Sequence, residues 1–303
     1  MNQTSHYTLT MAVLIEAGFD PGIAATIAWA NQNVDEWRSG QSEKLKIGQQ
    51  NIPVPMTQEY GYAAATAMLS KSLLDQLAET VWRPFHFWSG GIDGIVQSYI
   101  LKDFVNRFSL HSEVEQCRQA TAYDMASNRV FRAACLFGIA LHVQQDTWSH
   151  ATFCGWRDDV NSIHGPMDPR SVVPNIGHAE SSDPDDPYAM WKRVPDGPTV
   201  DNRAKWHQWI KSTFAFLSPD EALAPQVVEA IFLDSSTEAE LQSGLEQFIE
   251  RRSADPFPQF EMNMPTSFDS LTEYHDSNTH TWLGAARHWL ELYHKDRRLF
   301  RLP

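Results

Sequence analysis

Cysteine is scarce in this chain of 303 residues. The three cysteines are odd in number and show no Cys-x-x-Cys spacing, which excludes a disulfide framework and a zinc ribbon. We therefore expect Cys117, Cys135 and Cys154 to be reduced thiols in the core.

Long apolar runs and an export signal are also missing. No uninterrupted apolar stretch approaches the roughly 20 residues that cross a membrane, so we expect no transmembrane segment. The first residues contain no basic region followed by an apolar run, so no Sec signal peptide is visible. The localisation stays open between the cytoplasm and export by a signal-independent route.

Basic residues are few compared with acidic ones. The chain has 24 Lys and Arg and 38 Asp and Glu, which gives a net charge of −14. Such an acidic surface repels a phosphate backbone, and no stable nucleic-acid complex is expected. Hydrophobic residues make up 42% and aromatic residues 12% of the chain, which is typical of a globular protein with a sizeable core.

Strand-like alternation is scarce as well, whereas helical periodicity recurs along the chain. A segment rich in Pro, Gly, Asp and Ser, residues 155–198, is predicted to be a long functional loop. The sequence therefore predicts a compact all-α fold in one domain over residues 1–303. The expected helices cover residues 7–17, 21–36, 57–80, 93–108, 112–152 with a break at 120–127, 201–217, 219–232, 237–251 and 271–296.

The most informative segment places His142, Asp146 and His150 at positions i, i+4 and i+8. On a helix these side chains lie within about 80° of one another, and each step climbs about 6 Å. The surrounding residues are apolar, so the stripe is expected to face the core, where metal ions would give it partners. The outer members are about 12 Å apart, too far to share one ion. Asp146 would then bridge a metal on the His142 side and one on the His150 side, the alternative being an intrahelical hydrogen bond.

Further candidate ligands lie near helix ends or in the long loop. His6 begins the first helix, Asp35 lies on an apolar helix one turn after Asn31, and His86 is surrounded by aromatic residues. Taken singly, each is also compatible with a surface residue, a salt-bridge partner or a hydrogen-bonded core histidine. In the loop the candidates are His178, Glu180, Asp183 and Asp185.

In this order the candidate residues resemble the ligand series of the zinc-dependent phospholipase C and single-strand-specific nuclease superfamily. The resemblance is closer to a bacterial branch with the patterns LHxxxDxxSHxxF and GHAExxxPDxPY, which stand here at residues 141–153 and 177–188. It implies an all-helical fold with two or three zinc ions in a cleft, and hydrolysis of phosphate diesters.

Carried over residue by residue, the resemblance implies three groups of ligands. The third group departs from the superfamily, whose first residue is a ligating Trp, because this chain begins with Met1. Another departure is Ser182, which stands where other members have an acidic ligand, so that Asp185 is favoured instead. The implied ligands are Asp35, His86, His142 and Asp146 for one zinc, His150, His178 and Asp185 for a second, and His6 with bridging Asp146 for a third.

The function implied by this resemblance is phospholipase C-type cleavage of a phospholipid, with transient contact to a membrane surface. Asp35 would be the catalytic general base that faces the attacking water. Aromatic residues near the ligands suit acyl chains, and the negative charge disfavours a polyanionic substrate. The alternatives are a single-strand nuclease or nucleotidase, a phosphomonoesterase, and a non-catalytic metal-stabilised helical protein.

Overall fold

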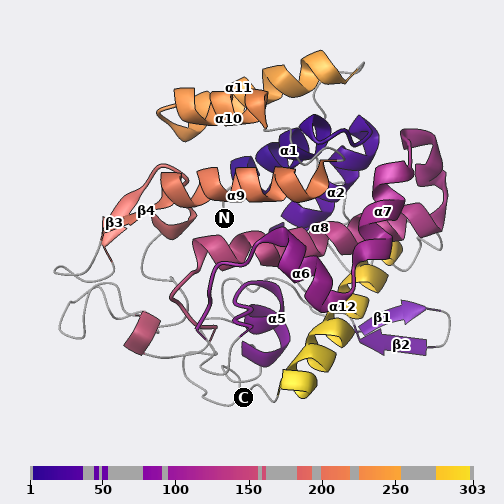
Figure 1. The fold of residues 1–303 in the computed structure, drawn as a ribbon. Helices are drawn as coiled ribbons and strands as arrows, with labels where there is room; N and C mark the ends of the chain where they lie inside the picture. The colour runs from indigo at the N-terminus through magenta and orange to yellow at the C-terminus, as the bar shows by residue number, and fades with distance from the viewer. Residues whose placement is uncertain are drawn as a thin grey trace.

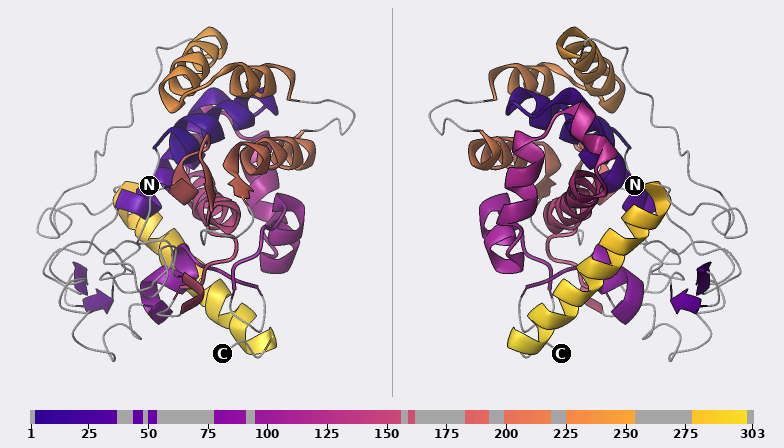
Figure 2. Two further views of the ribbon diagram at one scale, coloured as in Figure 1. Left: turned by 90° about the vertical axis from the view of Figure 1, so that its left-hand side faces the viewer. Right: turned by 90° about the vertical axis from the view of Figure 1, so that its right-hand side faces the viewer.

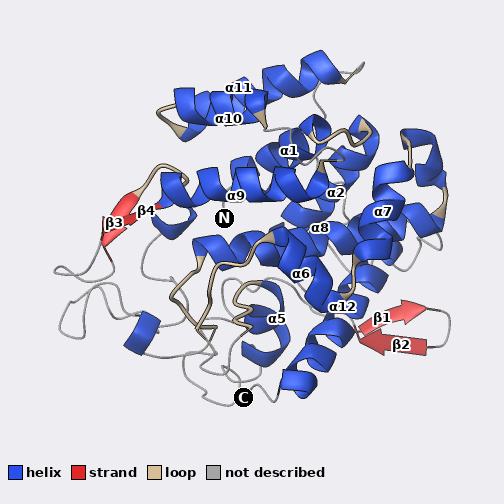
Figure 3. Ribbon diagram, viewed as in Figure 1, coloured by secondary structure: helices blue, strands red, loops and turns tan. Residues whose placement is uncertain are grey.

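The computed structural model describes residues 3–36, 44–47, 50–53, 78–90, 95–155, 159–161, 183–192, 199–218, 225–253 and 278–300. Helices predominate in these ranges, which confirms the all-α class (Figure 3). The strands described form two short antiparallel hairpins, in which β1 (Lys44–Ile47) pairs with β2 (Gln50–Pro53) and β3 (Met190–Lys192) with β4 (Thr199–Asp201).

The long helix α8 (Asn128–Ser149) forms the centre of the fold (Figure 1). Its side chains are buried almost without interruption from Phe131 to its end, as expected of a helix that is packed on all sides. Four of the helices that pack against it lie around its length, and the side views show it close to end-on between them (Figure 2). These are α2 (Pro21–Glu36), α7 (His111–Gln119), α9 (Asn202–Leu217) and α12 (Asn278–Phe300).

A second layer lies on the far side of α9. It consists of α1 (Thr10–Glu16), α10 (Gln226–Asp234) and α11 (Glu238–Arg252), which contact one another at the top of Figure 1. The Glu16 carboxylate accepts hydrogen bonds from the backbone N–H groups of Val227 and Val228, at 2.7 and 2.9 Å. It thereby satisfies free N–H groups at the start of α10 and ties α1 to it.

Helix α2 packs closely against α8. A Cβ atom built on Gly138 of α8 would lie 2.4 Å from the Ile27 carbonyl oxygen and 2.7 Å from the Ala30 Cβ. Only glycine fits at this contact, because any side chain would force the two backbones apart. The contact brings the last two turns of α2, with Asn31 and Asp35, against the polar half of α8.

Several predicted boundaries are corrected by the structure. The helix predicted over residues 93–108 is only α6 (Leu101–Phe108), because the backbone of Val96 pairs instead with Thr152 and Phe153. The helix predicted over residues 57–80 continues beyond residue 80 into α5 (Arg83–Phe85), where Pro84 lies in the first turn and is tolerated.

Other differences concern the loop and the C-terminal half. The predicted loop 155–198 contains strand β3, and α10 begins at Gln226 rather than at residue 219. The break predicted at 120–127 is confirmed, since it separates α7 from α8. Residues 57–77 of a predicted helix lie outside the described residues, and the single domain stays a prediction. Among the helices described, none is long and apolar enough to cross a membrane.

Candidate metal centre

Five elements carry the residues that the sequence singles out. His6 lies in the π-helix η1 (Thr4–Leu9), and His86 directly follows α5, which continues a second π-helix, η2 (Ala78–Trp82). Short π-helical turns are frequent at functional sites. Asp35 lies in the last turn of α2, and Asp185 ends the 3₁₀ turn η5 (Asp183–Asp185). The other three candidates, His142, Asp146 and His150, lie in α8 or at its C-cap.

Four donor atoms converge at the C-terminal half of α8, and we call them the inner group: His86 Nδ1, His142 Nε2, Asp35 Oδ1 and Asp146 Oδ2. The two imidazole nitrogens are 3.3 Å apart. Asp146 Oδ2 lies 3.1 Å from the His86 nitrogen and 3.3 Å from the His142 nitrogen. Asp35 Oδ1 lies 3.8 and 3.5 Å from the same two atoms.

These separations fit a metal ion at the centre of the inner group. Donors bonded to zinc at about 2.1 Å in a tetrahedron are roughly 3.4 Å apart, whereas hydrogen-bonded donors and acceptors lie closer, at about 2.9 Å. Both oxygens of Asp35 and Oδ1 of Asp146 are buried without a hydrogen-bond partner. Unpaired buried carboxylate oxygens are costly, and a cation would satisfy them. Two buried groups of three donors, His86 with His142 and Asp146, and His6 with Asp35 and His142, could therefore hold a metal ion.

His6 lies on the other side of the two carboxylates. Its Nε2 atom is 3.4 Å from Asp146 Oδ1 and 3.9 Å from Asp35 Oδ2. Its ring stacks on that of His142, with the ring centroids 4.3 Å apart. Each carboxylate thus turns one oxygen towards the inner group and the other towards His6, which is the geometry of two bridging carboxylates.

His150 and Asp185 form a separate pair, which we call the outer pair, with His150 Nε2 at 3.4 Å from Asp185 Oδ1. The Nδ1 atom of His150 donates to the carbonyl oxygen of His86 at 2.8 Å, so Nε2 is the atom left to ligate. The α8 spacing predicted that Asp146 would bridge towards His150. In the structure Asp146 Oδ2 lies 3.7 Å from His150 Nδ1, but that nitrogen is held by the His86 carbonyl, and the other oxygen of Asp146 faces His6.

The remaining residues of interest are two predicted loop candidates and two buried amides beside the histidines. His178 and Glu180 lie outside the described residues, so their predicted roles stay predictions. Asn31 forms hydrogen bonds to His6 and His142, and Gln145 forms one to His6, although sequence reasoning gave Gln145 no role. A buried amide within an apolar helix was the signal that would have pointed to it.

Charge in the centre is balanced between buried carboxylates and imidazoles. Burial alone would lower the pKa of His6, but the close contact with Asp146 and the charges of Asp35 and Asp146 outweigh it and raise the pKa to about 9. Burial opposes ionisation of Asp146 too, yet the neighbouring His150 and His142 hold its pKa well below the usual range. Burial lowers the pKa of His142. The centre therefore favours a charged Asp146 carboxylate, as metal binding requires.

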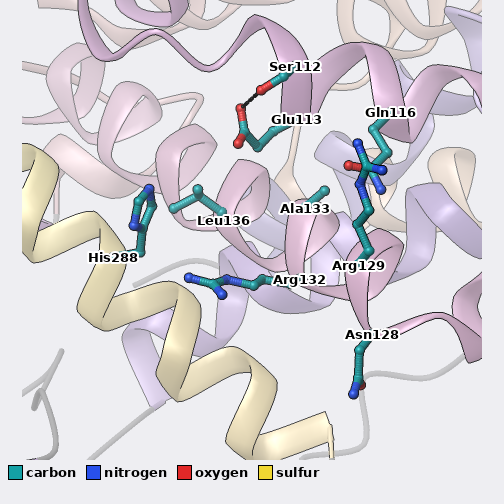
Figure 4. A pocket seen from close by; sticks show the side chains of 9 residues that line it. All are labelled: Ser112, Glu113, Gln116, Asn128, Arg129, Arg132, Ala133, Leu136 and His288. Atoms are coloured by element: carbon teal, nitrogen blue, oxygen red, sulfur yellow. Dashed lines mark hydrogen bonds between the residues drawn. The ribbon is translucent and has the colours of Figure 1, made fainter.

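A pocket of about 480 Å³ lies at the opposite end of α8 (Figure 4). Its walls include Arg129 and Arg132 of α8, Glu113 of α7 and His288 of α12. Arg132 lies ten residues before His142, which is about 15 Å along the helix axis. None of the candidate ligands lines this pocket, so it is separate from the metal centre.

Comparison with known proteins assigns the chain to a family but to no activity. The model of a family of unknown function, DUF6765, matches residues 1–297, and the chain belongs to this family. No curated protein and no solved structure matches the chain. The function must therefore be argued from the geometry of the centre.

Proposed function

We propose that this chain is a zinc-dependent phosphoric ester hydrolase that cleaves phospholipids in the manner of a phospholipase C. The observation that carries the proposal is the inner group, in which two imidazole nitrogens lie 3.3 Å apart and each lies 3.1–3.8 Å from an oxygen of Asp35 and of Asp146. Two imidazoles and two carboxylates are a donor set that suits zinc. The remaining donors, on His6 and in the outer pair, provide for a second and a third ion.

The candidate residues would have different roles in such a centre. The inner group would hold one ion, and His6 with the second oxygens of Asp35 and Asp146 another. The outer pair, with His178, would hold the third. Zinc bound there would supply Lewis acidity towards the phosphate ester and lower the pKa of water. Asp35, whose oxygens have no hydrogen-bond partner, is the proposed general base.

The surroundings of the outer pair favour a lipid substrate over a nucleic acid. The ring of Phe87 stacks on His150, with the centroids 4.5 Å apart, and packs in a small apolar cluster with Phe153 and Trp191. Asp185 is the most exposed of the described donors, with 15% of its side chain accessible. We propose that substrate enters on this side, where aromatic rings suit acyl chains and the net charge of −14 repels a polyanion.

The test combines metal analysis with a panel of substrates. Purified protein should contain at least two zinc equivalents and should cleave phosphatidylcholine faster than single-stranded DNA or a chromogenic phosphate monoester. Asp35→Asn should lose activity while it remains folded, and Asp234→Asn, at the exposed end of α10, is the matched control.

Each alternative has its own outcome in this test. If DNA were cleaved faster than phosphatidylcholine, the protein would be a nuclease and not a phospholipase C. If the monoester were cleaved faster, it would be a phosphatase. Bound zinc without any hydrolysis would indicate a metal-stabilised structural protein. A protein that stays folded and active after exhaustive chelation would contradict the metal centre itself.

A further inference from the structure

Behind the two histidines His6 and His142 lies a buried network of amide and hydroxyl groups, formed by Asn31, Gln145 and Thr10. Asn31 Oδ1 is 3.1 Å from His6 Nδ1 and 3.2 Å from His142 Nδ1. Gln145 Oε1 is 2.9 Å from the same His6 nitrogen. The network therefore contacts both imidazoles on the side opposite to the candidate metal positions.

The direction of every hydrogen bond in this network follows from one backbone carbonyl. The Ser5 carbonyl oxygen can only accept, and it receives Gln145 Nε2 at 3.3 Å and Thr10 Oγ1 at 3.3 Å. With its NH₂ group committed there and to Thr10, Gln145 must present its oxygen to Asn31 and His6. The result is that the side-chain amide of Gln145 has only one possible orientation.

The orientation of Gln145 in turn determines those of Asn31 and of the two histidines. Asn31 Nδ2 donates to Gln145 Oε1 at 2.7 Å and to Thr10 Oγ1 at 3.2 Å. Its oxygen must then face the histidines, and an amide oxygen accepts only. Both imidazoles therefore donate from Nδ1, so that in the neutral, metal-binding form of each ring Nε2 carries no proton and faces Asp35 or Asp146.

We propose that Asn31 and Gln145 are positioning residues that fix His6 and His142 in the Nδ1–H tautomer and thereby prepare two metal positions at once. This inference rests on the proposed function, because it assumes that the Nε2 atoms bind zinc. Asn31 acts on both positions, since one oxygen accepts from both rings. The proposed general base Asp35 follows Asn31 by one turn of α2, so this one helix carries a ligand and its support.

The test measures zinc affinity by competition with a chromogenic chelator. Asn31→Leu and Gln145→Met keep the size of each side chain and remove its hydrogen bonds. We expect zinc affinity to fall about 10- to 100-fold, as is typical when the partner of a ligating histidine is lost. Helical content, read by circular dichroism, should be retained.

Two buried amides provide matched controls. Asn33 lies on the same helix, and its side-chain atoms have no hydrogen-bond partner among the described residues. Gln144 is the neighbour of Gln145, but it binds the Tyr99 carbonyl and the Trp209 indole instead. Asn33→Leu and Gln144→Met should therefore leave zinc affinity within about twofold of wild type.

A spectroscopic measurement on the wild-type protein makes the inference independent of how the variants fold. In zinc-loaded protein with ¹⁵N-labelled histidine, His6 and His142 should both carry their proton on Nδ1. Protonation of Nε2 in either ring, or unchanged zinc affinity in Asn31→Leu, would overturn the positioning role and leave the zinc centre standing. A wild-type protein that binds no zinc would overturn both.

Discussion

The inner group and the outer pair use the same kinds of donor but are held in different ways. The inner donors are at most 4% exposed and come from α2, from α8 and from the segment after α5. Each of these parts is fixed by helix packing. In the outer pair, Asp185 lies on a single 3₁₀ turn and is 15% exposed. Rigid burial suits a permanently bound ion, and partial exposure suits contact with substrate.

The inner group and the outer pair are also held by hydrogen bonds to different parts of the fold. Trp289 of α12 donates to the Pro84 carbonyl oxygen at 2.7 Å, and Trp88 donates to Asp296 of the same helix at 3.3 Å. The inner histidine His86 lies between these two anchors. Asp185 is held nearby by Asn202, whose amide donates to the carbonyl oxygens of Pro184 and Asp186. Helix α12, remote in sequence, thus anchors the chain on both sides of His86.

The largest loss of zinc affinity is expected from Asp146→Asn. Asp146 serves His6 with one oxygen and the inner group with the other, so the neutral amide should weaken two metal positions. We expect the affinity of both to fall by about 100-fold or more. Zinc content after dialysis checks this. His6→Ala should empty one position only, and equal losses in the two variants would argue against a bridge.

A pH series on metal-free protein separates the charge of the centre from its packing. The pKa of His6 is raised from 6.5 to about 9, and that of His150 is also raised. The contribution of His6 to stability is complete below pH 6.5 and is lost as the pH rises through about 9, and that of His150 is lost in the same direction. For His6 alone this amounts to about 3 kcal/mol. His142, whose pKa is lowered, is neutral in this range and does not compensate.

Urea unfolding at pH 6 to 9.5 measures the effect. The metal-free protein should become less stable over this range. The zinc-loaded protein should not, because metal binding needs unprotonated histidine and strengthens as the pH rises. Parallel pH dependences of the two forms would contradict the assignment of His6 as a ligand.

Gly138→Ala tests whether helix packing builds the inner group. The added Cβ meets the Ile27 carbonyl, so the free energy of unfolding should fall by about 2 kcal/mol. Zinc affinity should fall with it, as Asp35 moves away from Asp146. Gly284→Ala on α12 is the matched control. Its Cβ has nothing within 4 Å, so this variant should be as stable as wild type or more stable. Thermal melts and zinc titrations compare the two.

The smallest effect should come from Asp185→Asn in the outer pair. It weakens one partly exposed donor, and we expect the affinity of one ion to fall about tenfold while the inner group keeps its zinc. Asp186→Asn is the control, because Asp186 is exposed and caps the Tyr188 N–H instead. Loss of all zinc in Asp185→Asn would show that the two sets of donors are not independent.

Helix starts and the buried face of α8 could be predicted from residues that are close together in the sequence. Asp20 before Pro21 marks the start of α2, and the Asp20 carboxylate accepts the Gly22 N–H at 2.9 Å. The apolar run around Leu141 predicted a buried helix, and the i, i+4 spacing put His142 and Asp146 on one face of it. Such features depend on residues within one or two turns, which is why the sequence alone contains them.

Contacts between distant segments were decided only by the tertiary structure. The sequence determined that α8 is a buried helix with a polar stripe, but not which oxygen of Asp146 faces which histidine. That choice depends on Gly138, which lets α2 approach, and on the His86 carbonyl, which turns His150 towards Asp185. The amide network likewise joins Ser5, Asn31 and Gln145 across more than 100 residues. No periodicity records such contacts, because their geometry comes from how the helices pack and not from the order of residues within any one of them.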